Sequence, residues 1–336
     1  MGIFRKLGWY FKQEWRRYLL GVTFLLLVAL VNLIPPKVIG DLVDAMSKSR
    51  LTSSHLAWML GLLLFSGVAQ YLFRFGWRNA IWGGAAKLER TLRTRLFWHF
   101  MKMDATFYQK HRTGDLMAHA TNDLNAVQNV AGAGILTLFD SMITGGTTII
   151  AMVLVVDWRL TIVAILPMPL LAVMARKLGT RLHGAFSESQ AAFSRLNDKT
   201  QESVSGIKVI KTFGQEAEDT ADFNQIVDHT VQINRRVNMI DALFDPTTSL
   251  IMGLTYVITI IYGGWQVVHG QITIGQLVSF VTYVSALVWP MFAIGRLFNI
   301  LERGNASYDR VDELLQEKST ILEAKDAITT PAHGDI

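Results

Sequence analysis

Few residues in this sequence are of a type and spacing that could catalyse a reaction or hold a metal ion. The chain has no cysteine, which excludes disulfides, thiolate nucleophiles and cysteine-ligated metal sites. None of its eight histidines lies three or four residues from another, so no two can share one helix face as metal ligands. No glycine is followed by lysine, so the phosphate-binding pattern Gly-x-x-x-x-Gly-Lys-Ser/Thr is absent. We therefore expect no catalytic, cofactor or metal site in this chain, which alone should neither bind nor hydrolyse ATP.

One carboxylate stands in an otherwise uncharged stretch. Between Leu124 and Val156, Asp140 is the single Asp, Glu, Lys or Arg. An ionised carboxylate that faces lipid is costly, so Asp140 should face a partner residue, a watery cavity or the headgroup region. Two interpretations stay open: Asp140 attracts a cationic substrate in a cavity, or it is a structural or interfacial residue.

A periodic stripe of aromatic and aliphatic residues near position 290 is a second candidate for substrate contact. Its members recur every three or four residues and therefore share one face of a helix beside Pro290. Aromatic and methionine side chains on such a face adapt to varied apolar cations. Packing between helices is the equally weighted alternative. The stripe consists of Phe280, Tyr283, Leu287, Met291, Ile294 and Phe298.

Long runs without charge identify the elements that must position these residues. The chain is 51% hydrophobic and 18% charged, where a soluble domain carries about a quarter charged residues. A helix of about 20 apolar residues crosses the bilayer core. Six such spans are expected, so the fold class is an all-α membrane protein. The spans lie in 18–36, 51–73, 124–156, 160–175 and, as a hairpin divided at Gly263-Gly264 and His269–Gln271, in 246–295.

The basic residues predict the orientation. Of the 32 Lys and Arg residues, 28 fall on one side of the expected spans, which predicts that both termini are cytoplasmic. Residues 1–18 mix aromatic and basic side chains and are expected to form an interfacial elbow helix. The net charge of +5 comes with no aromatic-plus-basic motif, so we expect no nucleic-acid partner.

Two long segments on that cytoplasmic side contain no proline. Segments 74–123 and 176–245 are therefore expected to be arms in which membrane helices continue outward and meet at a turn. Gly114 and Gly214 are expected to break the outgoing helices, and Asp115 to place a negative charge at the start of a returning helix. An independent cytoplasmic helical bundle is the alternative.

The arm tips, 104–112 and 211–219, are expected to pair exposed aromatic residues, Phe213 among them, with polar residues. This composition is typical of a short helix that docks into a groove on another domain. An ordinary capped hairpin in solvent is the alternative. The docking residues are expected to be Thr106, Phe107, Tyr108, Gln109 and Lys110 in the first arm, and Gly214, Gln215, Glu216, Ala217 and Glu218 in the second.

An ordered set of short motifs resembles the transmembrane domain of type I ABC exporter half-transporters, most closely subunits of bacterial heterodimeric multidrug exporters. The resemblance covers nearly the whole chain. It rests on Pro35–Asp41, Phe107-Tyr108 with Thr113–Leu116, Asn122-Asp123, Asp157–Thr161 with Pro167, Glu202–Ile207 with Lys211 and Glu216, Gly270–Gly275 with Tyr283 and Pro290, and Asn305–Ser307 with Arg310-Val311.

The resemblance implies a six-helix transmembrane domain over 19–304 and a linker over 305–336. It implies that the arm tips are coupling helices 1 and 2, which grip nucleotide-binding domains, in a domain-swapped dimer with a second, non-identical half. His333–Ile336 resembles the segment that opens the family's ATPase domain, so ATP and Mg²⁺ are expected to bind in a domain outside this sequence.

We therefore expect the membrane half of an ATP-driven exporter of amphipathic small molecules, located in the cell membrane. Energy would enter through the arm tips and switch a central cavity between inward and outward access. The alternatives are a motor-free membrane protein, such as a channel, secondary carrier or regulatory subunit, and export of lipids or peptides by the same architecture. A gradient-driven carrier should show several buried ionisable groups and matched helix breaks, and here only Asp140 and Pro290 approach this.

Overall fold

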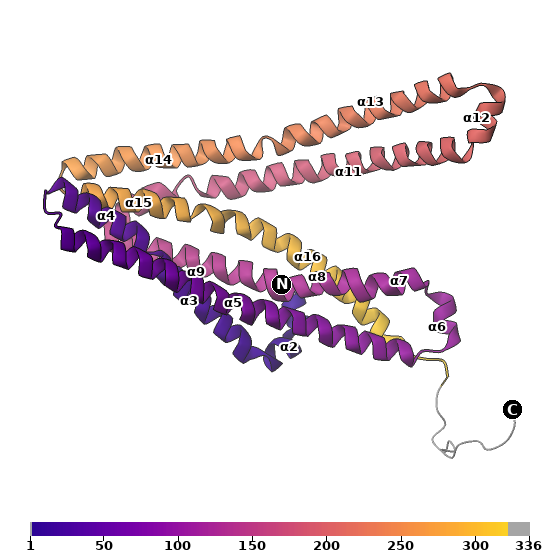
Figure 1. Cartoon of the computed structure of the whole chain (residues 1–336), viewed down its shortest axis with the longest axis horizontal. Helices are drawn as coiled ribbons and strands as arrows, with labels where there is room; N and C mark the ends of the chain where they lie inside the picture. Colours follow the sequence, from indigo (N-terminus) through magenta and orange to yellow (C-terminus); the bar gives the residue numbers. More distant parts are fainter. Residues whose placement is uncertain (1, 322–336) are drawn as a thin grey trace, which may run out of the picture. The chain divides into compact units, whose positions relative to one another are not determined.

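The computed structural model describes residues 2–321, apart from the side chains of residues 294 and 295 (Figure 1). Regular structure in the described part is helical throughout, which confirms the expected all-α class. Six helical runs are long and apolar enough to cross a membrane, as predicted, and each extends beyond its apolar stretch. They are Trp15–Ser47, Ser53–Met101, Thr113–Val156, Trp158–Ser205, Glu216–Val268 and Ile274–Gln316.

The chain divides into two compact units, which are described separately. The first unit comprises Met1–Ile34, Gly61–Gly146 and Arg296–Ile336. The second comprises Pro35–Leu60 and Thr147–Gly295.

The N-terminal residues of the first unit form two short helices, α1 (Gly2–Lys6) and α2 (Gly8–Gln13), before α3 (Trp15–Asn32) begins. The single helix expected over 1–18 is therefore wrong. The chain turns at Leu7 and Glu14, because Ile3, Leu7 and Tyr10 are buried against the long helix α5 (Ser53–Met101). The Tyr10 hydroxyl donates a hydrogen bond to the Gly84 carbonyl oxygen at 2.6 Å and fixes this packing.

The core of the first unit forms where three helical runs meet. Leu88 and Leu92 of α5 are buried beside Leu124 and Val130 of the third run and Leu301 of α16 (Val288–Gln316). A Cβ atom on Gly304 would lie 2.0 Å from a Val130 methyl group, so glycine allows this close approach of α16. The third run continues through three π-helical turns and comprises α7 (Thr113–Ala118), η1 (His119–Asp123), α8 (Leu124–Asn129), η2 (Val130–Gly134), α9 (Ile135–Ala151) and η3 (Met152–Val156).

The second unit contains α4 (Ile34–Ser47) and the turn predicted at Asp157. The Asp157 carboxylate accepts hydrogen bonds from the backbone N–H groups of Arg159 and Leu160 at 2.8 and 2.9 Å and so caps α10 (Trp158–Ile165). Gln266 donates to the same carboxylate at 3.0 Å. Desolvation raises the pKa of Asp157, but these hydrogen bonds to the ionised form together outweigh it and hold the pKa below its usual range.

The last hairpin of the second unit joins α14 (Phe244–Val268) and α15 (Ile274–Ala286). The turn lies at His269–Thr273, where Gly270 has a φ of 70°, in agreement with the predicted polar break. Gly263-Gly264 lies inside α14, so its predicted role as a divider is wrong. A Cβ atom on Gly263 would lie 2.4 Å from Leu277 Cδ1, so this glycine serves helix packing.

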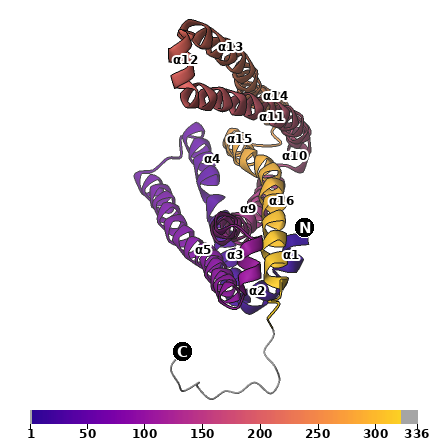
Figure 2. The same cartoon turned by 90° about the vertical axis from the view of Figure 1, so that its right-hand side faces the viewer.

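The absence of proline predicted arms continuous with the membrane helices, and the first arm agrees. In the second arm the returning helix α13 (Glu216–Asp241) ends before α14 begins at Phe244, so a turn at Ala242-Leu243 interrupts this arm without a proline. Helix α5 has 49 residues without interruption, and α11 (Pro169–Ser205) has 37. Helix α13 lies beside α11 (Figure 1). Lys199 of α11 joins the two through ion pairs of 2.9 and 2.8 Å with Asp219 and Asp222. In Figure 2, α12 (Ile207–Phe213) closes this hairpin.

Candidate functional site

The first arm ends in a short helix, α6 (Ala105–Lys110), between α5 and α7. Asp104 begins α6 by accepting a hydrogen bond from the Phe107 backbone N–H at 3.1 Å. His111 and Arg112 are extended and separate α6 from α7. Gly114 therefore lies in the first turn of α7 and does not break the outgoing helix, which ends at Met101, so that prediction is wrong. Asp115 does lie in the first turn of the returning helix, as predicted.

The two aromatic residues of α6 face different surroundings. Phe107 is only 6% exposed and packs with Leu96, Leu116 and Leu314, so its expected exposure is wrong. Tyr108 is 45% exposed, and its hydroxyl donates to the Phe100 carbonyl oxygen at 2.7 Å. The outward face of α6 consists of Thr106, Tyr108, Gln109 and Lys110, and Phe107 anchors the helix from behind.

Helix α6 is bonded to the chain that follows α16. The Asp104 carboxylate accepts hydrogen bonds from the Ser319 hydroxyl at 3.0 Å and from the Thr320 backbone N–H and hydroxyl at 2.6 Å each. These bonds, the Thr320 hydroxyl first, hold the pKa of Asp104 well below its usual range. His111 Nε2 also lies 3.1 Å from the Glu317 carboxylate. The linker predicted over 305–336 therefore begins as helix α16, and residues 322–336 lie outside the described residues.

The second arm ends in α12, which lies between Gly206 and Gly214. Gly214 has a φ of 63° and ends α12, so a helix does end there as predicted, but the outgoing helix α11 already ends at Ser205. The short helix precedes Gly214, which corrects the prediction that placed it at Gly214, Gln215, Glu216, Ala217 and Glu218. Gly214 and Gln215 form the turn, and the other three begin α13, where carboxylates favour a helix N-terminus. Lys211 pairs with Glu216 across the turn at 3.2 Å.

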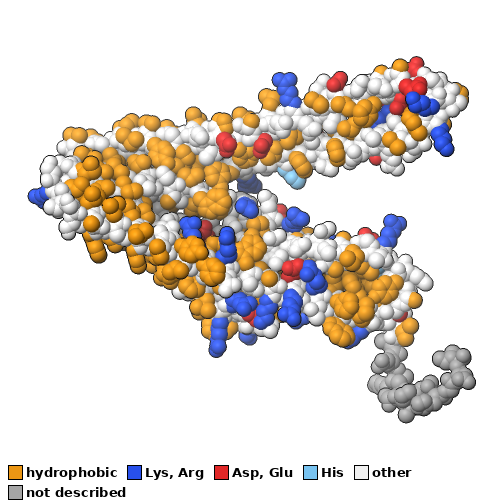
Figure 3. Space-filling model, in the orientation of Figure 1, with side chains coloured by type: hydrophobic (Ala, Val, Ile, Leu, Met, Phe, Trp, Pro, Cys, Tyr) orange, Lys and Arg blue, Asp and Glu red, His pale blue; other side chains and the backbone are white. Residues whose placement is uncertain are grey.

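Phe213, the aromatic residue expected at the second tip, is 74% exposed. The other exposed apolar residues on and beside α12 were not singled out from the sequence, among them Val209 at 60% exposed. Val204 and Ile207 are exposed as well. The available signal was the spacing of these apolar residues, which lie two to four positions apart in a proline-free segment and so favour a helix. The predicted docking residues, 214–218, lay just after this segment. Figure 3 shows acidic and basic side chains around this tip, while hydrophobic side chains dominate along α14.

The predicted substrate-contact residues fall in both units. Phe280, Tyr283 and Leu287 are at most 1% exposed inside the second unit, which favours the helix-packing interpretation for these three. Met291 is half-buried, and the side chain of Ile294 lies outside the described residues. Asp140 is half-buried in the first unit and accepts a hydrogen bond from the Thr144 hydroxyl at 3.2 Å.

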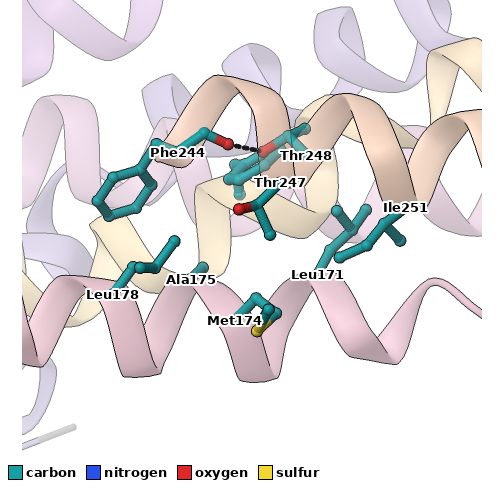
Figure 4. Close-up of a pocket in the computed structure, with 9 residues that line it drawn as sticks. Leu171, Met174, Ala175, Leu178, Phe244, Thr247, Thr248 and Ile251 are labelled. Atoms are coloured by element: carbon teal, nitrogen blue, oxygen red, sulfur yellow. Dashed lines mark hydrogen bonds between the residues drawn. The ribbon is translucent and has the colours of Figure 1, made fainter. Parts of the chain in front are cut away.

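A small apolar crevice lies between α11 and α14 of the second unit (Figure 4). Leu171, Met174 and Leu178 line it from α11, and Phe244 and Thr248 from α14. The Thr248 hydroxyl donates to the Phe244 carbonyl oxygen at 2.8 Å, so its hydrogen-bonding capacity is used within α14. The crevice has a volume of about 10 Å³, which is room for little more than one water-sized group, so we assign no ligand to it.

Residues 18–291 match the family described as the ABC transporter transmembrane region. The chain belongs to this family. It is 41% identical over 334 residues to the probable multidrug resistance ABC transporter ATP-binding/permease protein YheI of Bacillus subtilis, covering 99% of the chain and 57% of that protein. It is 40% identical over 328 residues to the multidrug resistance-like ATP-binding protein MdlA of Escherichia coli, covering 98% and 56%. It is 28% identical to the ATP-dependent lipid A-core flippase of Syntrophus aciditrophicus over 243 residues, which cover 71% of the chain and 40% of that protein.

This ABC transporter transmembrane region is a multi-pass membrane domain that spans little more than half the length of YheI and MdlA. Its two arm tips are anchored differently. Phe107 and Asp104 hold α6 against α5, α7 and the end of α16. At the second tip, the turn after α12 is closed by Lys211 and Glu216, and α12 presents mainly exposed side chains.

Proposed function

We propose that this chain is the membrane-spanning half of an ATP-driven exporter of amphipathic small molecules. The observation that carries the proposal is that each arm, formed by helices that extend the membrane spans, ends in a short helix with an exposed outer face. The names of YheI and MdlA, which match nearly the whole chain, support the multidrug class of substrate. ATP and Mg²⁺ bind in nucleotide-binding domains outside the described residues.

The arms act as levers between those domains and the membrane. The exposed residues of α6 and α12 contact the nucleotide-binding domains, and their movement passes along α5 and α11. An uninterrupted helix of 49 residues such as α5 is about 70 Å long at 1.5 Å per residue and transmits displacement with little bending. The membrane helices then alternate between inward and outward access, and Asp140 attracts cationic substrates.

The partner is a second transmembrane half, non-identical to this one. The 28 basic residues on one side support cytoplasmic termini in the cell membrane. In that orientation both arm tips lie in the cytoplasm, where nucleotide-binding domains and ATP are available.

The test is dye transport by the complete protein with its partner in inside-out vesicles. We expect Mg²⁺-ATP to drive uptake of a cationic fluorescent dye and vanadate to stop it. Because this chain has no native cysteine, single substitutions Tyr108→Cys and Phe213→Cys allow cross-links from the tips to the nucleotide-binding domains to be mapped. Uptake driven by an ion gradient without ATP would instead support the motor-free alternative. ATP-driven movement of lipid or peptide but not dye would assign another cargo class.

A further inference from the structure

A groove of about 830 Å³ opens in the first unit between the start of α3 and the middle of α5. Its two ends differ in character. Gln13, Arg16 and Arg17 line one end with polar or charged groups, where Arg17 lies opposite Gly83. Leu20, Phe24 and Gly76 line the other end and offer no polar side chain, and Asn79 and Ala80 lie between the two ends. A ligand that fits both ends must itself be amphipathic.

The polar end carries an excess of positive charge. Arg16 and Arg17 are both exposed, and Glu14 is the one acid among the residues that line the groove. The Glu14 carboxylate forms an ion pair with Lys87, which does not line the groove, and lies 3.9 Å from Arg17. Lys87 largely neutralises Glu14. Arg17 Nη1 donates to the Gly83 carbonyl oxygen at 3.4 Å, and the other N–H groups of Arg17, together with those of Arg16, remain to attract an anion. Arginine binds phosphate oxygens with two parallel N–H donors, which makes a phosphate group the best match.

The two ends of the groove also lie at the depths of the headgroup and of the acyl chains of a phospholipid in the bilayer. Arg17 is followed by 19 residues without Asp, Glu, Lys or Arg, which places it at the edge of the hydrocarbon. From Arg17 to Phe24, α3 rises about 10 Å, so the apolar end lies at acyl-chain depth. The exposed Trp15 at the polar end is a residue type typical of the membrane interface.

We propose that this groove binds one anionic phospholipid. Its phosphate lies between Arg16 and Arg17, with the Asn79 amide as a further donor, and its first acyl segment lies along Leu20 and Phe24. This proposal requires only that the chain is inserted in a membrane. It does not depend on the proposed export function, so lipid binding and export can each be disproved separately.

The first test is native mass spectrometry of the complete protein titrated with dioleoylphosphatidylglycerol or dioleoylphosphatidylcholine. We expect Arg16→Gln with Arg17→Gln to weaken phosphatidylglycerol binding roughly tenfold, since two close charges are lost, and to leave phosphatidylcholine binding unchanged. The matched control is Arg5→Gln with Lys12→Gln, which removes the same charge from exposed residues of α1 and α2 outside the groove. An equal loss in both double variants would reveal diffuse attraction and overturn the site.

Two further experiments test the groove itself. A Cβ atom on Gly83 would meet nothing closer than Asn79 Oδ1 at 4.0 Å, so a side chain can start there without a clash, and Gly83→Leu places an isobutyl group at the groove. We expect it to lower the occupancy of phosphatidylglycerol. Excess inorganic phosphate should not displace the lipid, and complete displacement would instead identify a small-anion site and overturn the lipid proposal.

A measurement on the unaltered protein keeps the proposal testable if a variant misfolds. Phosphatidylglycerol with a diazirine on its acyl chain is cross-linked in membranes, and the labelled peptides are identified. We expect enrichment in peptides that contain 13–24 and 76–83. Labelling spread evenly over the lipid-facing helices would overturn the proposal.

Discussion

The Asp104 carboxylate accepts hydrogen bonds from both the backbone N–H and the hydroxyl of Thr320, each at 2.6 Å. The same carboxylate caps α6 through the Phe107 backbone N–H. One side chain therefore joins a short helix at an arm tip to the segment that leaves α16. We therefore expect a displacement of α6 to shift residues 319–320, and the reverse.

Asp104→Ala is expected to loosen both segments. Loss of a helix cap costs about 1 kcal/mol, which corresponds to roughly fivefold faster amide exchange in Ala105–Lys110. Residues 317–321 should lose protection in the same variant, because three bonds from Ser319 and Thr320 end on Asp104. Hydrogen exchange with mass spectrometry measures both. Asp115→Ala, in the first turn of α7, is the control, and a change at only one of the two segments would refute the link.

The Asp104 link should also depend on pH. The pKa of Asp104 is lower in the folded chain than its unfolded value of about 3.9, so its contribution is fully present above that value and is lost as the pH falls through the folded-state pKa. We expect protection of 317–321, corrected for intrinsic exchange, to be constant from neutral pH to about pH 5 and to fall below about pH 4. The measurement uses a Glu317→Gln background, because His111 also contacts Glu317. Asp104→Asn should abolish the acid-induced change.

Substitutions at the arm tips should distinguish residues that couple ATP hydrolysis to transport from residues that pack inside the tip. Tyr108→Ala and Phe213→Ala remove exposed side chains, so we expect normal folding and substrate binding but ATP hydrolysis that dye no longer stimulates. Phe107→Ala instead opens a cavity against Leu96 and Leu314, which costs about 3–5 kcal/mol and destabilises the tip itself. Glu216→Gln weakens the ion pair that closes the second tip and should reduce coupling partly. Unchanged coupling in all four variants would contradict the lever mechanism.

A close helix crossing in the second unit predicts a strong glycine requirement. A Cβ atom on Gly275 would lie 2.0 Å from the Gly40 carbonyl oxygen, which is backbone and cannot move aside cheaply. Gly275→Ala should therefore destabilise the protein by about 1–3 kcal/mol. Gly253→Ala, also inside a helix but with nothing within 4 Å, should be neutral or stabilising by up to about 1 kcal/mol. Thermal unfolding in detergent measures the difference, and equal midpoints for the two variants would show that α4 and α15 separate freely.

Asp140→Asn should weaken transport of cationic dyes more than that of neutral dyes of similar size. The substitution removes the charge and keeps the side-chain volume. Thr144→Val is the matched control, because it removes the hydroxyl that donates to Asp140 and retains the carboxylate. Transport of paired dyes by the complete protein gives the ratio. If Asp140→Asn lowers both rates equally, Asp140 is a structural residue.

Several features could be predicted from the sequence because each rests on a local physical rule. Uncharged runs long enough for the bilayer determined the six spans, since a buried charge is costly in lipid. The absence of proline in 74–123 and 176–245 predicted long helical arms such as α5 and α11, although it did not predict the turn at Ala242-Leu243. Gly214 and Gly270 could be recognised as turn positions because glycine adopts positive φ without strain.

Other features were decided by the tertiary structure. Thr320 reaches Asp104 from 216 residues away, and no local pattern joins them. Phe107 and Tyr108 are adjacent aromatics, yet contact with Leu314 buries one and leaves the other exposed. Helical spacing of Phe280, Tyr283 and Leu287 predicts a shared face but not what covers it. Packing partners distant in the chain determine which face is buried, and the periodicity of a single segment cannot identify those partners.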